Sequence, residues 1–261
     1  MRRRIKVKTI YICIMLKKII CILFAGGIAI SEAQTFQIFK GDTINRKDKS
    51  KVPQGIWKKY YANDSLFSEC VFKDGKRTGV FKTYYRSGKL QSIMNYRARV
   101  DISDALIYFE DGKVKAKGKY TGVHKDSLWI YYNSKGAITS TEYYENGRKE
   151  GSWKIFYPGG SLSQETTYKK GTKHGPYNTF FESGKKKLEV NVSNGKYEGT
   201  AILFHPNGNV WMKGNHQNGV RHGIWRVFKE DGQPDFEEEY RKGINLNPIP
   251  ELEEKIEEPE K

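Results

Sequence analysis

The sequence contains little cysteine: Cys13, Cys21 and Cys70 are the only three in 261 residues. Two of them lie within the first 33 residues, a segment that has the features of an export signal. If that segment is removed, Cys70 is the only thiol left. The exported chain would then form no internal disulfide and hold no zinc site built on several cysteines. Its stability has to come from packing, with Cys70 as a small, half-buried strand residue.

Long apolar runs are also missing. The longest, Ile19 to Ile30, has twelve residues, too few to span a bilayer unaided. It follows Lys17 and Lys18 and ends before Ser31-Glu32-Ala33, the pattern of a cleaved signal peptide. We therefore expect residues 1–33 to be a signal peptide and the protein to be exported to the periplasm, outer envelope or medium. Met15 offers a more conventional start, and an uncleaved membrane anchor is the alternative.

Acidic residues are scarce in the body of the chain. The whole sequence has 46 Lys and Arg against 30 Asp and Glu, and the 34–246 region has 37 against 23, an excess of 14. The last fifteen residues, "NPIPELEEKIEEPEK", reverse this balance with six Glu and two Lys. Their Pro and Glu content favours disorder, so 247–261 is predicted to be an acidic disordered tail, either free or folded back on the basic body.

Aromatic residues and glycine are abundant, and they recur with a fixed period. From Gly55 the chain divides into eight windows of 24 residues, 55–246, without any insertion. Position 6 of the window is aromatic in all eight: Tyr60, Tyr84, Tyr108, Tyr132, Phe156, Phe180, Phe204 and Phe228. Position 3 is aromatic in six windows, four of them with Trp: Trp57, Trp129, Trp153 and Trp225. Such a period indicates a tandem repeat.

Glycine marks the turns. Position 10 is Gly in seven windows, with Asp64 as the exception: Gly88, Gly112, Gly136, Gly160, Gly184, Gly208 and Gly232. A second signal, such as Asn-Gly or Asp-Gly, ends at position 21. Glycine is favoured there because these turns need a positive φ. Each window therefore predicts two strands of six or seven residues. We expect an all-β fold, an elongated sheet or solenoid of about eight stacked β-hairpins.

The sequence does not decide which face of the sheet each aromatic position occupies. Positions 3 and 6 have opposite parity, so a regular strand would point them to opposite faces. Either a bulge intervenes or both faces carry aromatic rows.

The segment "NGRKEGSWKIFYPGG", with "GKRTGVFKTYYRSGKL" and "NGVRHGIWRVFKEDG", resembles the MORN-repeat variant family of bacterial proteins. The resemblance covers Gly55 to about Leu246. Windows three and seven depart from it, with Ala105 and Ala201 at the Trp position. Residues 34–54 are expected to be an N-terminal cap. The family implies stacked hairpins with a scaffolding or binding role; the antitoxin label of some members does not suit an exported chain.

Recognisable catalytic motifs are absent: there is no Gly-x-Ser-x-Gly, phosphate loop or dinucleotide fingerprint. His174 and His222 occupy the same repeat position, which marks them as repeat residues. His205 and His216 share a window with His222, but no carboxylate stands at a ligand spacing beside them. We expect no enzyme, no cofactor and no metal; an envelope enzyme is a distant alternative.

Binding is the better interpretation. Lysines and arginines lie beside aromatic residues and form the candidate binding surface: Lys58, Lys59, Lys82, Arg86, Lys154 and Arg226. We expect a scaffold that binds a protein partner in the bacterial envelope. The alternative is attachment to an anionic membrane or wall polymer, or to a glycan; export disfavours nucleic acid. The simplest alternative is that the aromatics form the core and the lysines only solvate it. The sequence does not indicate an oligomeric state.

Overall fold

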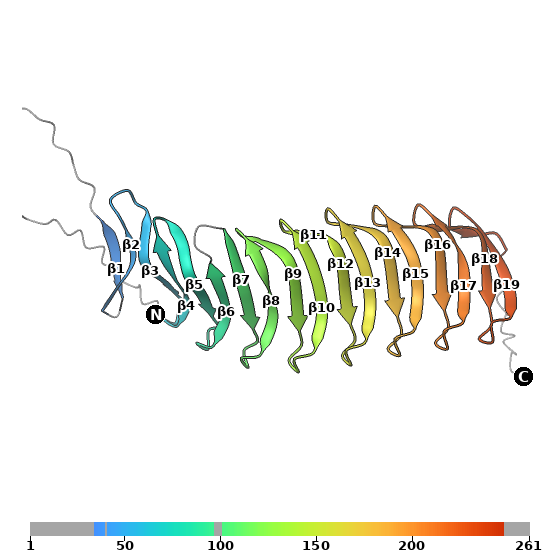
Figure 1. Ribbon diagram of the computed structural model, residues 1–261, viewed down its shortest axis with the longest axis horizontal. Coiled ribbons are helices and arrows are strands. Elements are labelled where there is room, and N and C mark those ends of the chain that lie inside the picture. The colour runs from blue at the N-terminus through green and yellow to red at the C-terminus, as the bar shows by residue number, and fades with distance from the viewer. Residues whose placement is uncertain (1–33, 40, 97–100, 248–261) are drawn as a thin grey trace, which may run out of the picture. The chain divides into compact units, whose positions relative to one another are not determined.

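The computed structural model describes residues 34–39, 41–96 and 101–247, and these form twenty β-strands and no helix (Figure 1). The predicted signal peptide, residues 1–33, and residues 248–261 of the predicted tail lie outside the described residues. No helix in the described ranges has the length and apolar character needed to cross a membrane.

The chain divides into two compact units, the first ending at Gly136 and the second beginning at Ala137. Unit 1 contains β1 (Thr35–Phe39), β2 (Asp42–Lys47), β3 (Pro53–Tyr60), β4 (Leu66–Lys73), β5 (Lys76–Tyr84), β6 (Leu90–Tyr96), β7 (Ile102–Tyr108), β8 (Val114–Thr121) and β9 (His124–Tyr132). Unit 2 contains β10 (Ile138–Glu145), β11 (Arg148–Lys149), β12 (Gly151–Phe156), β13 (Leu162–Lys169), β14 (Thr172–Phe180), β15 (Lys186–Ser193), β16 (Lys196–Phe204), β17 (Val210–Gln217), β18 (Val220–Phe228), β19 (Pro234–Arg241) and β20 (Ile244–Asn245).

Within each unit, strands that follow one another in the sequence pair antiparallel. In unit 1 this holds from β1 to β9, and in unit 2 β12 pairs with both β10 and β13 and the series continues to β20. The all-β hairpin repeat is thus confirmed. Most repeat strands have eight or nine residues, longer than the expected six or seven.

Two kinds of turn join the strands. The shorter turn has positive φ at positions 20 and 21, as at Asn194 (φ 49°) and Gly195 (φ 80°), which is the type I′ geometry that Asn-Gly favours. The longer turn spans positions 7–11. In it the Gly88 N–H donates to the Tyr85 carbonyl (2.9 Å), and Gly88 has a φ of 83°. Asp64 adopts φ 62° at the same position, where its Cβ is accommodated at a cost.

The register settles which face each position occupies. Lys59 pairs with Ser68, but Tyr60 pairs with Leu66, so the extra residue of the bulge, Phe67, lies in the partner strand. The first strand of each hairpin keeps its alternation. Positions 3, 5, 14, 16 and 18 therefore share one face, which we call the indole face. Positions 2, 4, 6, 15 and 17 share the other, which we call the position-6 face. Both faces carry aromatic rows, and a bulge is present as well.

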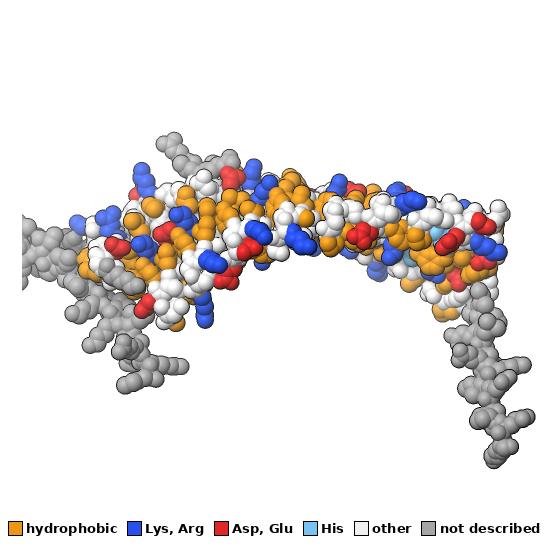
Figure 2. Space-filling view, turned by 90° about the horizontal axis from the view of Figure 1, so that it is seen from below, with side chains coloured by type: hydrophobic (Ala, Val, Ile, Leu, Met, Phe, Trp, Pro, Cys, Tyr) orange, Lys and Arg blue, Asp and Glu red, His pale blue; other side chains and the backbone are white. Residues whose placement is uncertain are grey.

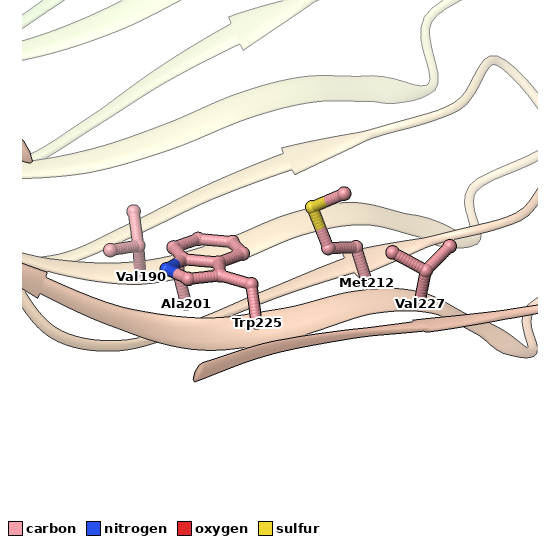
Figure 3. Close-up of a cluster of buried hydrophobic side chains, with 5 residues drawn as sticks. All are labelled: Val190, Ala201, Met212, Trp225 and Val227. Carbon is pink, nitrogen blue, oxygen red and sulfur yellow. The ribbon is translucent and has the colours of Figure 1, made fainter. Parts of the chain in front are cut away.

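The core lies on the indole face. In unit 2 its centre is a cluster of five buried side chains that project from the same side of the sheet (Figure 3): Val190, Ala201, Met212, Trp225 and Val227. Cross-strand pairing brings them together, since Val190 lies opposite Ala201 and Met212 opposite Val227. In unit 1 the buried side chains on this face include Ala105, Ala116 and Trp129.

The cap is built on the first repeat. Phe39 of β1 stacks on Tyr60 with ring centroids 4.0 Å apart. The Asn45 side chain of β2 accepts from the Lys58 N–H (2.9 Å) and donates to the Lys58 carbonyl (3.1 Å). Ile44 is buried at 3% exposure. The cap therefore supplies hydrogen-bond partners to the backbone at the outer edge of β3 over part of its length.

Candidate binding surfaces

The indole of Trp225 packs on Gly214 of the neighbouring strand, a residue that has no side chain. Trp225 has 0% exposure. Its ring covers Gly214 so closely that a Cβ on Gly214 would lie 2.3 Å from the indole Cδ2. The indole Nε1 donates to the Asn215 carbonyl (3.2 Å), and the Arg221 guanidinium lies 4.5 Å from the ring centroid. This tryptophan is a structural residue, held by packing, a hydrogen bond and a cation.

Trp129 in unit 1 has the same surroundings. It also has 0% exposure, and a Cβ on Gly118 would lie 2.3 Å from its ring. Its Nε1 donates to the Lys119 carbonyl (3.0 Å), and Lys125 lies 4.8 Å from its ring centroid. The glycine at position 16 of one repeat makes room for the indole at position 3 of the next.

Windows three and seven, which have alanine at position 3, fit this arrangement. Ala105 pairs with Gly118, and Ala201 pairs with Gly214, so both alanines line the sites that receive the indoles. Their exposures are 2% and 0%. Windows three and seven, which looked degenerate in the sequence, thus supply small residues where the following repeat places its largest side chain.

Basic residues at position 23 lie over the aromatic rings at position 3 of the next repeat. Arg77 is 5.0 Å from the Phe81 centroid, Lys149 is 4.2 Å from that of Trp153, and Lys173 is 5.0 Å from that of Tyr177. Such cation–π contacts contribute about 0.5–1 kcal/mol each at exposed sites. The sequence did not predict this row, although a basic residue four positions before five of the six position-3 rings was a visible signal.

The six candidate binding residues do not form one patch. Lys58, Lys82, Lys154 and Arg226 are at position 4 on the position-6 face, whereas Lys59 is exposed on the indole face and Arg86 lies in a turn. The four at position 4 each pair with a carboxylate: with Asp42 (3.4 Å), Glu69 (3.6 Å), Glu165 (3.4 Å) and Glu237 (2.7 Å) respectively. Their charges are therefore largely balanced within the chain.

The aromatic row at position 6 is half-buried along its whole length. The Tyr84 hydroxyl donates to Glu69 Oε1 (2.6 Å), and burial together with this hydrogen bond raises the pKa of Tyr84 to about 12. Lys117 lies 5.7 Å from the Tyr132 centroid, and Lys213 lies 5.3 Å from that of Phe228. The aromatic rings on this face thus pack against the long side chains of Lys117 and Lys213.

Side chains at position 7 form a row of hydrogen bonds between neighbouring repeats, which the sequence did not predict. The hydroxyls of Tyr61 and Tyr85 donate to the carbonyls of Tyr84 (2.8 Å) and Tyr108 (2.7 Å), and Tyr157 repeats the bond in unit 2. Each bond joins one repeat to position 6 of the next. Figure 2 looks onto the edge where the longer turns lie, and hydrophobic side chains there adjoin Lys and Arg.

The histidines of window seven do not converge. The His205 Nε2 lies 2.9 Å from the Phe228 carbonyl, so His205, also at position 7, contacts position 6 of the next repeat as the tyrosines do. His222 is exposed. His216 packs edge-on against Trp225 (5.0 Å), and burial lowers its pKa. No group of three or more His, Cys, Asp or Glu side chains within the described residues could hold a metal ion. Cys70 is half-buried, and burial raises the pKa of its thiol.

The position-6 faces of the two units differ in chemistry. Five aliphatic residues on this face of unit 1 are between 37% and 53% exposed: Ile56, Val71, Val80, Leu106 and Leu128. The charge is uneven too. Residues 34–136 hold 21 basic and 10 acidic side chains, an excess of 11, and residues 137–246 hold 16 and 13, an excess of 3. Unit 1 thus combines most of the positive charge with most of the exposed aliphatic surface of this face.

Comparison with known families identifies the repeat. The sequence model described as "MORN repeat variant" matches residues 53–74, 77–98, 149–170, 197–218 and 221–242. All five matches begin two residues before a window and so keep the period of 24. They include window seven, despite Ala201 at the Trp position.

Comparisons with individual proteins add little. No curated protein matches the chain. Among solved structures, the "Crystal Structure of TarM" is 9% identical with a TM-score of 0.26, over 37% of this chain and 18% of that chain. The "Crystal Structure of TcdB2-TccC3" is 10% identical with a TM-score of 0.22, over 82% and 14%. The chain therefore spans less than a fifth of either structure, and neither similarity supports an argument about function. On its repeat pattern, its hairpins and the five family matches, the chain belongs to the MORN repeat variant family.

Proposed function

We propose that this protein is an exported, non-enzymatic scaffold that binds other proteins in the bacterial envelope. The observation that carries the proposal is the row of exposed aliphatic side chains on the position-6 face of unit 1. Ile56 and Val71 lie opposite each other on this face, and apolar side chains that gather on an exposed surface mark sites of partner contact. The repeat returns to the same position every two strands, roughly 10 Å apart, so an extended partner surface would meet equivalent side chains in succession.

Export rests on the sequence of residues 1–33. Lys17 and Lys18, the twelve-residue apolar core and the Ser31-Glu32-Ala33 end follow the signal-peptide pattern. Cell fractionation with mass spectrometry of the purified protein tests this part. The proposal expects an envelope or secreted fraction and a mature N-terminus at Gln34. A chain that retains Met1 or Met15 in the cytosol would contradict it.

Binding is tested by photo-crosslinking in cells. A photoreactive amino acid replaces Leu128, which is 48% exposed on the position-6 face of unit 1, and in a matched variant it replaces Ile224, the same repeat position in unit 2 at 50% exposure. The proposal expects a defined protein adduct from position 128 that persists at high salt and is weaker from position 224. Failure to trap any protein from position 128 would overturn it.

Attachment to an anionic membrane or wall polymer is the second candidate. The excess of 11 basic side chains in residues 34–136 favours it, because summed charge attracts polyanions. Salt separates the two candidates: charge-driven attachment to anionic vesicles or wall polymer is lost when ionic strength rises, since exposed charges are screened beyond roughly 8 Å at physiological salt. Attachment of this kind without any protein adduct would replace the scaffold by the second candidate.

A further inference from the structure

We propose that the acidic C-terminal segment, residues 248–261, docks on the position-6 face of unit 1 in a second copy of the protein. The inference rests on the proposed binding role of that face and names its partner. It joins a basic, aliphatic surface in unit 1 to a segment of this chain with the opposite charge and matching apolar residues.

The receiving surface is centred on β7, β8 and β9. Leu106 lies opposite Lys117, and Lys117 lies opposite Ile130. Leu106 and Leu128 are 37% and 48% exposed. Lys117 thus has aliphatic cross-strand neighbours on both sides, in contrast to Lys82, which lies opposite Ile93 but reaches Glu69 at 3.6 Å. A cation set among exposed aliphatic side chains is a favourable place for a carboxylate that arrives with apolar neighbours.

The patch extends across the unit. Ile56 and Val71 lie opposite each other at 53% and 43% exposure, and Val80 on β5 is 43% exposed. Asp104 and Lys119 pair across β7 and β8 on the side of the shorter turns. These exposed aliphatic residues, together with Lys117 and Lys119, form the receiving surface.

The segment 248–261 has the complementary chemistry. It carries six Glu and two Lys, a net charge of −4. Its apolar residues include Leu252 and Ile256, four positions apart. That spacing places both side chains on the same side of either an extended strand or a helix. Carboxylates at Glu251, Glu253 and Glu257 adjoin them. The segment can therefore present two aliphatic anchors together with acidic residues.

The segment follows unit 2, whereas the receiving face lies in unit 1. Asn247 is fixed beside β19, because its Nδ2 donates to the Glu237 carbonyl (3.2 Å) and its Oδ1 accepts from the Glu239 N–H (2.7 Å). A second copy can offer its unit 1 to this segment whatever the placement of the two units within one molecule.

Docking between copies would be head-to-tail, since the segment and the face are different surfaces. Each copy then offers one segment and one receiving face. The expected consequence is self-association that grows with concentration and weakens with salt. Sedimentation velocity of the full chain and of a variant that ends at Asn247 tests this. The full chain should associate, and the truncated chain should remain monomeric under the same conditions.

A labelled synthetic peptide of residues 248–261 gives a direct readout by fluorescence anisotropy on the truncated chain. Two pairs of variants occupy equivalent repeat positions in the two units. Leu128→Ser and Lys117→Glu change unit 1, and Ile224→Ser and Lys213→Glu change unit 2. We expect each unit 1 variant to weaken peptide binding by about tenfold, equivalent to about 1.4 kcal/mol. The unit 2 variants should bind the peptide like the unaltered protein.

A peptide with Leu252→Ser and Ile256→Ser, tested on the unaltered truncated chain, keeps the test independent of protein folding. It should lose about tenfold in affinity. Equal binding by both peptides, equal effects of the unit 1 and unit 2 variants, or self-association that survives truncation would each overturn the proposal. If these tests fail while photo-crosslinking at position 128 still traps another protein, the scaffold stands and the tail is not its partner. If both fail, the binding role of this face falls as well.

Discussion

The two units use one repeat to make position-6 faces of different chemistry. Every aromatic at position 6 is Tyr in unit 1 and Phe in unit 2. In unit 1, positions 2, 4, 15 and 17 hold seven aliphatic residues: Ile56, Val71, Val80, Ile93, Leu106, Leu128 and Ile130. In unit 2 they hold two, Ile202 and Ile224. Side chains on this face are exposed or half-buried, so packing restricts them little, and the two units differ where a partner would contact them.

The indole faces show the opposite behaviour. Ala105, Gly118 and Trp129 in unit 1 recur as Ala201, Gly214 and Trp225 in unit 2, each 96 residues later. Both indoles are fully buried over a glycine. Close packing explains this likeness, because an indole of fixed shape leaves space only for small neighbours. The core face is therefore restricted by volume, and the position-6 face is not.

The largest expected effect comes from removing a buried indole. Trp129→Ala and Trp225→Ala should each lower the free energy of unfolding by about 4 kcal/mol. Trp153, which has Glu142 instead of glycine at position 16 and is only half-buried, should lose about 2 kcal/mol in Trp153→Ala. Urea unfolding followed by circular dichroism measures the difference. Equal decreases in the free energy of unfolding for Trp153→Ala and Trp225→Ala would show that a glycine beneath the indole makes no difference to its contribution.

Filling the space beneath the indole should be nearly as severe. Gly118→Ala and Gly214→Ala place a Cβ 2.3 Å from ring atoms of Trp129 and Trp225. Such overpacking should cost about 3 kcal/mol in each unit, measured by the same urea unfolding. Cys70→Ala, at the same repeat position, is the control and should cost less than about 1.5 kcal/mol, as a small change at a half-buried site. A mild effect in one unit alone would show that the two sites are not equivalent.

The longer turns allow a smaller, two-directional test. Gly160→Val in unit 2 forces a β-branched residue to φ 93° and should destabilise by about 2 kcal/mol. Asp64→Gly in unit 1 relieves the strain at φ 62° and should stabilise by about 0.5 kcal/mol. Melting temperatures of the two variants should move in opposite directions. Shifts of the same sign would contradict the turn assignment.

The tyrosine row gives the smallest effect. Tyr84→Phe removes the hydrogen bond to Glu69 and should cost about 1 kcal/mol at neutral pH. The folded pKa of Tyr84, about 12, lies above its ordinary value of 10.0. The stability linked to its neutral form is therefore intact below pH 10 and is lost as the pH rises through about 12.

Unfolding measured between pH 9 and pH 12 checks this point. The unaltered protein should lose stability over that range more steeply than Tyr84→Phe. Tyr85→Phe, which removes a hydrogen bond at position 7 but leaves the Tyr84 phenol in place, is the control and should retain the steeper loss. Parallel curves for the unaltered protein and Tyr84→Phe would show that this phenol contributes nothing to the pH dependence.

The period of 24 was sufficient to predict the all-β fold and the turns. Glycine at position 10 and Asn-Gly at positions 20 and 21 have a local cause, the positive φ of the turn, and local causes are readable in a sequence. The aromatics at position 6 could be found by counting. Their placement on the face opposite Trp225 depended on parity, which a bulge could have reversed, so the sequence left that point open.

The core contacts, the ion pairs and the hydrogen bonds between repeats could not be predicted, because they depend on which residues lie opposite one another in the sheet. Gly214 is one of 26 glycines in the sequence, and its role is visible only when Trp225 is placed above it. Arg226 looked like part of a basic surface because Glu237, its cross-strand partner, is eleven residues away. The Tyr85 hydroxyl bonds to a carbonyl in the next repeat, which no local pattern marks. Cross-strand partners decide both the core and the net charge of a surface.

The most direct test of the repeat frame is hydrogen exchange at the five indole N–H groups, resolved by NMR. The indoles of Trp129 and Trp225 are buried and donate to the carbonyls of Lys119 and Asn215, whereas Trp211 is 43% exposed. We predict that Trp129 and Trp225, 96 residues apart, exchange slowest and at similar rates, and that Trp211 exchanges fastest. Exchange at Trp129 or Trp225 as fast as at Trp211 would contradict the account.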